Sequence, residues 1–352
     1  IGNSSKSGCD SAGQKNFWTI MKNYFDGGTK GSVAEVAVVS RVDGTAVSGS
    51  DRYATNYQVN LANMVAGKPV FVVTGRDFPD ALSIGPVAGI LGGSVVLSRN
   101  SGVDSNLLSL LKQRPPSAVY VVGGVGAVSD AAVNQLQDAT GKTVERVRGK
   151  DRYETSAAVF EKFFKSRSFG APFIASGANY PDALSAASAG GALARPVLLV
   201  PGTLKDAELP SEVAKTLKSK GIKSVILVGG KGAVSASAAS NIKAQGFSIE
   251  RVFGTDRYKT NVAINDYVTK QEPGTAVEGL WVASGKGFPD ALSATAAAGS
   301  ASQRLVLSNG TCLPSPTISS WVNGASSTIT KISLVGGKGV LPGPHQLLRE
   351  CS

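Results

Sequence analysis

The sequence predicts an α/β protein built from three tandem modules, each with a parallel β-sheet. Three short motifs recur in the same order three times along the 352 residues. Between them, short runs of β-branched residues alternate with helical stretches, a pattern typical of βαβ units. Glycine-rich turns follow several of these runs. Such a repeat determines the whole architecture. We expect three equal modules packed around a pseudo-threefold axis.

The three motifs return at intervals of 100 to 108 residues. The first motif is Gly-x-Asp-Arg-Tyr-x-Thr, at residues 49–55, 149–155 and 254–260. The second is an aromatic residue followed by Pro-Asp-Ala-Leu-Ser, at residues 78–83, 180–185 and 288–293. The third is Val-Gly-Gly-x-Gly, at residues 122–126, 228–232 and 335–339. Three motifs in register are a far stronger signal than any one of them.

The first half of unit one predicts a helix, a strand and a second helix. Asp51 suits an N-cap, because its carboxylate can accept orphan N–H groups of a helix that runs to about residue 66. The apolar run 70–73 is typical of a strand buried on both faces. A helix then begins near Pro79 and Asp80, where a proline is tolerated and an acid complements the helix dipole.

The second half of the unit continues this alternation. We expect strands at 95–97 and 119–122, separated by a helix over 107–112 that Pro115 and Pro116 terminate. The glycine pair of the third motif then leads into a helix near residue 129.

A strand precedes each Asp-Arg-Tyr helix, and we use these strands to place the module boundaries. The runs 144–147 and 250–252 precede the second and third copies, and the strand-like run 33–39 is expected to precede the first. Residues 43–47 are then interpreted as an insertion. The predicted domains are an N-terminal helical extension or upstream-domain tail over 1–31, and modules over 32–143, 144–248 and 249–352.

The charge balance favours an acidic partner. Lys and Arg number 36 and Asp and Glu 25, a net charge of +11, although only 17% of residues are charged. Such an excess attracts polyanions. The basic residues form no run and aromatics are 7%, so we expect no nucleic-acid partner. Apolar runs stay short of ~18 residues, which predicts no membrane span. Because Ile1 is not an initiator methionine, we expect a chain processed or cut from something longer.

Few side chains are available for catalysis. The single histidine, His345, argues against a Ser-His-Asp triad, and the three cysteines form no Cys-x-x-Cys pair of the kind that binds zinc. We therefore expect no enzyme activity, metal or cofactor. Hydrolysis by carboxylates stays open in principle. Cys312 and Cys351 flank the end of unit three and are predicted to form a disulfide, which fits an extracellular protein and leaves Cys9 without a partner.

The three motifs together resemble the type 2 cell-wall-binding repeat (CWB2) of Gram-positive surface proteins, over about residues 32–350. The resemblance implies Toprim-like modules arranged as a trimer within one chain. It also implies a secreted, non-catalytic protein that attaches non-covalently to the cell wall through anionic secondary polymers, such as a teichoic-acid-like chain. Family members often carry an effector domain, for example an amidase, which here would precede this chain.

Two groups of residues are candidates for the site. Arginine matches phosphate and carboxylate oxygens, and lysines in the glycine-rich turns could add charge; the polymer-binding candidates are Arg52, Arg152, Arg257, Lys231 and Lys338. The structural candidates, which would cap helices or form tight turns, are Asp51, Asp151, Asp256, Asp80, Asp182, Asp290, Gly123, Gly124, Gly229, Gly230, Gly336 and Gly337.

Alternative roles stay open at this stage. Each arginine could instead pair with the Pro-Asp-Ala aspartate of its own unit and hold two helix starts together. The glycine-rich turn could bind phosphate or only turn the chain. A hydrolase with a Toprim-like acidic site is disfavoured because no Asp-x-Asp occurs. A scaffold for host or cell-surface adhesion is compatible with wall binding.

Overall fold

The computed structural model describes residues 43–299, 302–310, 312–313, 328–337 and 339–341. Twelve strands and ten helices lie within these residues. They form three four-stranded sheets, each with all of its strands parallel. The predicted α/β class with parallel sheets is therefore confirmed. The expected N-terminal extension and the run 33–39 lie outside the described residues.

The first and second sheets have the same strand arrangement. The first has the order β3-β2-β4-β5, and the second the order β7-β6-β8-β9. Their strands are β2 (Val70–Thr74), β3 (Ser94–Ser98), β4 (Val119–Val122), β5 (Val144–Val147), β6 (Phe173–Ser176), β7 (Val197–Val200), β8 (Ser224–Val228) and β9 (Ser248–Val252).

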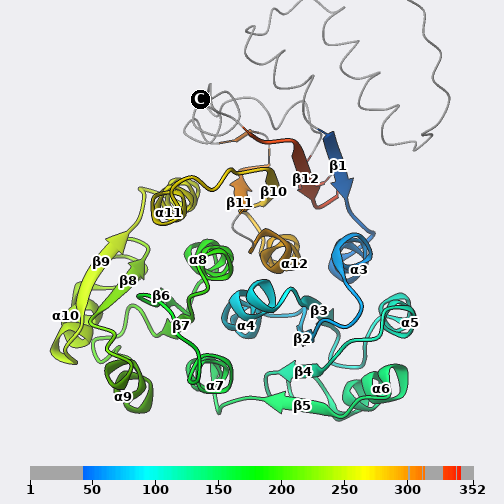
Figure 1. Cartoon of the computed structure of the whole chain (residues 1–352), viewed down its shortest axis with the longest axis horizontal. Helices are drawn as coiled ribbons and strands as arrows, with labels where there is room; N and C mark the ends of the chain where they lie inside the picture. Colours follow the sequence, from blue (N-terminus) through cyan, green and yellow to red (C-terminus); the bar gives the residue numbers. More distant parts are fainter. Residues whose placement is uncertain (1–42, 300–301, 311, 314–327, 338, 342–352) are drawn as a thin grey trace, which may run out of the picture.

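The third sheet combines the two ends of the described chain. It has the order β1-β12-β10-β11, with β1 (Asp43–Val47), β10 (Gly279–Ser284), β11 (Gln303–Ser308) and β12 (Lys331–Val335). Strand β1 pairs with β12 over its full length, with Asp43 opposite Lys331 and Val47 opposite Val335. Figure 1 shows these two strands side by side, although they come from opposite ends of the sequence.

This pairing corrects one prediction. Residues 43–47 are not an insertion but the edge strand β1 of the third sheet. The predicted boundaries at 144 and 249 assign β5 and β9 to the following module, whereas their hydrogen bonds run to β4 and β8 of the preceding one. The physical reason is that a crossover returns the chain to its own sheet before the next Asp-Arg-Tyr helix begins.

Three helices lie at the centre of the molecule, namely α4 (Pro79–Leu91), α8 (Pro181–Ala192) and α12 (Pro289–Ala298). Each of them contacts the other two. The backbones approach closely at Gly89, Gly191 and Gly299, since a Cβ on Gly191 would lie 2.8 Å from the Gly299 Cα. One continuous apolar core joins residues of all three modules.

Seven further helices lie within the described residues, namely α3 (Arg52–Asn63), α5 (Ser105–Gln113), α6 (Asp130–Thr140), α7 (Arg152–Phe163), α9 (Ser211–Ser219), α10 (Ala236–Ala244) and α11 (Arg257–Gln271). None of the helices in the described segments is long and apolar enough to cross a membrane. Among the seven further helices, α3, α7 and α11 contact the central helices α12, α4 and α8 respectively, whereas α5, α6, α9 and α10 lie at the periphery in Figure 1.

Candidate functional site

The Asp-Arg-Tyr motif forms the same helix start in all three modules. Its aspartate is the N-cap and accepts hydrogen bonds from the backbone N–H groups of the second and third residues after it, as Asp256 does from Tyr258 and Lys259 at 2.9 and 2.8 Å. Its threonine accepts a bond from the N–H of the motif's glycine, at 3.0 Å for Gly254 and Thr260. The motif therefore fixes the backbone that presents its arginine. The equivalent N-caps are Asp51 and Asp151.

Each motif arginine bridges two modules. Its Nη1 donates to the carbonyl of the glycine that follows a strand of its own module, and its guanidinium lies over an aromatic ring of the preceding module. The hydrogen bonds are Arg52 to Gly75 at 2.7 Å, Arg152 to Gly177 at 2.8 Å and Arg257 to Gly285 at 2.7 Å. The rings are Phe288, Phe78 and Tyr180, with Cζ-to-centroid distances of 5.4, 5.6 and 5.6 Å respectively.

The three aromatic rings also pack on one another edge to face. Their centroids lie 5.7 Å apart for Phe78 and Tyr180, 5.7 Å for Phe78 and Phe288, and 5.8 Å for Tyr180 and Phe288. Each ring precedes the first residue of a central helix. The arginines and the rings therefore form one cluster at the point where the three modules meet.

The Pro-Asp-Ala aspartate and the glycine-rich turn of each module fit against each other. Gly123 and Gly229 have φ angles of +109° and +101°, a conformation that favours glycine. A Cβ on either would collide with the Oδ2 of Asp80 or Asp182. Gly336 has a φ of +132°, and a Cβ there would lie 2.8 Å from the Asp290 Oδ2. This contact explains why the two motifs recur together.

Burial perturbs these aspartates. Desolvation raises the pKa of Asp80 to about 7, with the Asp77 carboxylate adding to the rise and Arg152 opposing it. Desolvation raises the pKa of Asp290 to about 6, against the opposing charge of Arg52. It also raises the pKa of Asp182, which a hydrogen bond from Thr260 and the charge of Arg257 partly offset. The nearby arginine thus comes from the next module, not from the aspartate's own unit, which corrects the pairing proposed from sequence.

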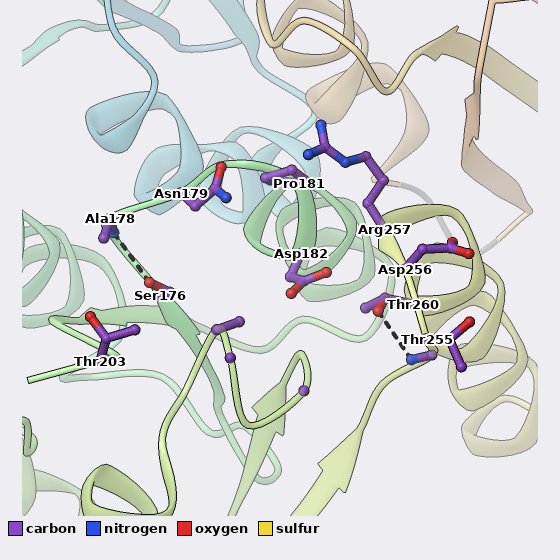
Figure 2. A pocket seen from close by; sticks show the side chains of 14 residues that line it. Ser176, Ala178, Asn179, Pro181, Asp182, Thr203, Thr255, Asp256, Arg257 and Thr260 are labelled. Carbon is purple, nitrogen blue, oxygen red and sulfur yellow. Dashed lines mark hydrogen bonds between the residues drawn. The ribbon is translucent and has the colours of Figure 1, made fainter.

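A pocket of about 450 Å³ lies at the junction of modules two and three, as Figure 2 shows. Asp182 points into it, and the Arg257 side chain extends away from Asp182 at its edge. The pocket contains two carboxylates, those of the half-buried Asp182 and of the N-cap Asp256, together with one guanidinium and several neutral polar groups. Its lining comprises Ser176, Ala178, Asn179, Pro181, Asp182, Thr203, Gly230, Gly232, Ala233, Gly254, Thr255, Asp256, Arg257 and Thr260.

An equivalent pocket of about 510 Å³ lies at the junction of modules one and two. Arg152 and Asp80 take the places of Arg257 and Asp182. Here Arg152 forms an ion pair with Asp77, with 3.3 Å between Nη2 and Oδ2. The lining comprises Thr74, Arg76, Asp77, Pro79, Asp80, Gly124, Gly126, Ala127, Gly149, Lys150, Asp151, Arg152 and Thr155.

The other predicted site residues divide between these junctions and the undescribed segments. Lys231 is exposed in the turn between Gly230 and Gly232, which both line the pocket at the junction of modules two and three. Lys338 and Cys351 lie outside the described residues. Cys312 is disulfide-bonded.

Sequence reasoning missed the residue that follows the motif threonine. The Asn56 side chain donates to the Val95 carbonyl at 3.0 Å and to Ser293 Oγ of the third module at 3.2 Å. Asn261 likewise bonds the Leu305 carbonyl and Ser185 Oγ, both at 3.0 Å. The sequence signal for this contact was a polar residue directly after the motif threonine in each repeat, together with the serine of each Pro-Asp-Ala-Leu-Ser motif.

Three α/β modules that share one core, with similar pockets at two described junctions, define this chain as a repeat protein. Residues 46–133, 146–239 and 251–344 each match the model of cell wall binding domain 2 (CWB2). The chain belongs to this family, and its function is binding to the cell wall.

Relatives and solved structures agree with this membership. The chain is 27% identical over 267 residues to the N-acetylmuramoyl-L-alanine amidase LytC of Bacillus subtilis, covering 75% of this chain and 50% of the relative. It is 26% identical over 196 residues to the amidase enhancer of the same organism, covering 56% of this chain and 26% of that relative. It thus spans half or less of either relative. The fold resembles that of Cwp6 from Clostridium difficile, with a TM-score of 0.73, 23% identity and coverage of 84% and 46%. Cwp8 from the same organism matches with a TM-score of 0.69 and 22% identity, and the match covers 94% of this chain and 53% of Cwp8.

Proposed function

We propose that this chain holds a secreted protein on the wall by binding an anionic secondary polymer, such as a teichoic-acid-like chain, at its module junctions. The observation that carries the proposal is the guanidinium that lines both described pockets, Arg152 in one and Arg257 in the other. Guanidinium groups suit phosphate and carboxylate oxygens. The net charge of +11 supplies a long-range attraction for the same polymer.

Repetition supports binding to a polymer in particular. A chain of repeating units can occupy more than one junction at once, and the second contact then forms at a high effective concentration. Weak individual sites are sufficient under these conditions. At the junction of modules three and one, Arg52 and Asp290 take the places that Arg257 and Asp182 have at the junction of modules two and three.

The architecture behind this proposal is a pseudo-threefold trimer of Toprim-like modules within one chain. Two observations support it: the mutual contacts of α4, α8 and α12, and the three aromatic rings with nearly equal separations. In such an arrangement the three junctions face the same side of the molecule and are available to one polymer.

We further propose a non-catalytic role. The buried aspartate of each pocket recurs at an equivalent helix start, and the second carboxylate, for example Asp256, is occupied by two backbone N–H groups. Glycoside hydrolysis uses two carboxyl groups with separate acid and base roles. The amidase activity named for one relative would then belong to the half of that protein that this chain does not span.

Cosedimentation with purified walls tests the proposal. Bacillus subtilis walls with their phosphodiester polymers and the same walls stripped by hydrofluoric acid are each mixed with the chain. We expect retention on the intact walls only, and weaker retention at 0.5 M than at 0.05 M NaCl because salt screens charge. Equal retention on stripped walls would sink the proposal. Loss of wall turbidity during the incubation would instead indicate a hydrolase.

A further inference from the structure

The two described pockets share a base but differ at the rim. Both contain a half-buried aspartate, an N-cap aspartate and a bridging arginine. The differences concern the residue just before the Gly-x-Asp-Arg-Tyr motif and the residue between the second and third glycines of the turn. At the junction of modules two and three these residues are Phe253 and Lys231; at the junction of modules one and two they are Arg148 and Val125.

Phe253 is a large apolar side chain exposed to solvent beside a pocket. Its exposed fraction is 54%, and the residue after it, Gly254, lines the pocket. Its ring edge lies 3.8 Å from the position of a Cβ on Gly230, a second lining residue. An exposed aromatic ring costs hydrophobic stabilisation, whereas beside a pocket it offers a flat face for a ligand.

The backbone around this ring is fixed. Arg251 Nη1 donates to the carbonyls of Gly229 and Val234 at 2.8 and 3.0 Å, which holds the glycine-rich turn closed. The Gly229 N–H donates to the carbonyl of Val252, the residue before Phe253, at 2.9 Å. The ring and the turn that carries Lys231 are therefore held next to each other before a ligand arrives, and preorganisation reduces the entropic cost of binding.

The polar groups of this pocket are mostly neutral. Asn179 occupies the place of Asp77, and each accepts a bond from the following N–H through Oδ1 at 2.9 Å. The two side chains differ by an amide in place of a carboxylate oxygen, so Arg152 has an ion-pair partner while Arg257 donates to the Tyr180 hydroxyl at 3.2 Å. Thr203 and Thr255 add further hydroxyl groups to the lining.

We propose that the junction of modules two and three is a sugar-ring subsite, where a pyranose of the wall polymer stacks on Phe253 and bonds Asn179, Thr203 and Thr255 through its hydroxyls. Lys231 then meets a neighbouring anionic group. The pocket volume of about 450 Å³ lies within the ~300–1,000 Å³ range of small-molecule sites. The junction of modules one and two, with Arg76, Arg148 and Lys150, holds the charged linkage instead. This inference rests on the proposed function.

Phe253→Ala in the full chain tests the subsite by cosedimentation on both wall preparations over a range of salt. We expect about tenfold weaker binding at every salt concentration, because stacking on an aromatic ring is lost but no charge is removed. Phe253→Trp should keep wild-type affinity. Arg148→Ala should mainly flatten the salt dependence. Val65→Ala, at a site with 55% exposure outside either pocket, is the matched control and should change nothing.

The outcomes separate the two proposals. Wild-type affinity of Phe253→Ala on both wall preparations would overturn the subsite, and so would a loss that disappears at high salt. Equal retention of the wild type on intact and stripped walls defeats the anionic-polymer proposal alone. In that case a tenfold effect of Phe253→Ala on the stripped walls still supports a sugar subsite, now for the peptidoglycan.

Discussion

The Arg52 guanidinium lies over the Phe288 ring, with 5.4 Å from Cζ to the ring centroid, and thereby joins the first module to the third. The same junction contains the pairing of β1 with β12. The described chain is thus closed on itself by an arginine, a ring and a strand. The equivalent arginines, Arg152 and Arg257, join modules that follow each other directly in the sequence.

Arg52→Ala should loosen this closure. The variant loses the hydrogen bond to the Gly75 carbonyl and the contact with Phe288, worth about 1–3 kcal/mol together. We expect faster amide hydrogen exchange in β1, measured by mass spectrometry. Arg114→Ala is the control, because Arg114 also donates to carbonyls, those of Leu61 and Met64, but within its own module. Equal exchange in β1 of both variants would contradict the closing role of Arg52.

Asn56→Ala should destabilise the junction of modules one and three. Asn56 accepts a bond from the Leu97 N–H at 2.9 Å, and its removal leaves that buried N–H without its acceptor. The Val95 carbonyl and the Ser293 hydroxyl lose one bond each but keep their bonds to Asn60 and Pro289. A buried donor left unpaired costs about 1–3 kcal/mol, so we expect the free energy of unfolding to fall by about that amount in urea titrations.

The sequence itself offers a milder variant for this position. Module two has Ser156 there, whose Oγ accepts from the Leu199 N–H at 3.0 Å and reaches the Val197 carbonyl at 3.5 Å. Asn56→Ser should therefore lose less stability than Asn56→Ala. An equal loss in the two variants would show that packing, not hydrogen bonding, explains the effect.

Gly123→Ala and Gly124→Ala should differ sharply, although the two glycines are adjacent. Gly123 has positive φ, and a Cβ there collides with the Asp80 carboxylate, whereas a Cβ on Gly124 meets nothing within 4 Å. We expect a loss of about 2 kcal/mol or more for Gly123→Ala and close to none for Gly124→Ala, measured by chemical denaturation. Similar losses would mean that the glycine pair is needed only for turn flexibility.

Local sequence patterns were sufficient for most elements of the fold. The N-cap aspartates, the buried strands and the proline at the start of the central helices all follow from rules that involve a few neighbouring residues. Residues 43–47 could not be placed in this way. Asp43-Gly44-Thr45-Ala46-Val47 lacks the apolar run of a central strand, because β1 is an edge strand and its partner lies almost 300 residues later.

The site was predictable in its residue types but not in its partners. Arginine and aspartate recur in every unit, so an interaction between them was a natural hypothesis. Which copies share a pocket depends on how the modules pack, and the structure places Arg257 and Asp182 in one pocket and Arg152 and Asp80 in the other. Phe253 gave no repeat signal at all, since the equivalent residues are Arg148 and Ser48.

The raised pKa of Asp80 predicts that stability decreases as pH rises through neutrality. Burial raises that pKa to about 7 from 3.8, so the folded state binds a proton that the unfolded state has released between these values. The resulting stabilisation is complete below pH 3.8 and is lost as pH rises through about 7, by up to about 4 kcal/mol. Asp290, whose pKa burial raises to about 6, adds to the same trend.

Asp80→Asn should remove most of this dependence, because an amide cannot become charged in the same place. We expect the variant to be more stable than the wild type at pH 8, by a smaller margin at pH 5, and close to it at pH 4, in urea titrations across that range. Asp138→Asn, at an exposed position, should keep the wild-type profile. A profile of Asp80→Asn as steep as that of the wild type would show that Asp80 stays charged in the folded protein and that its neighbours, Arg152 above all, compensate for its burial.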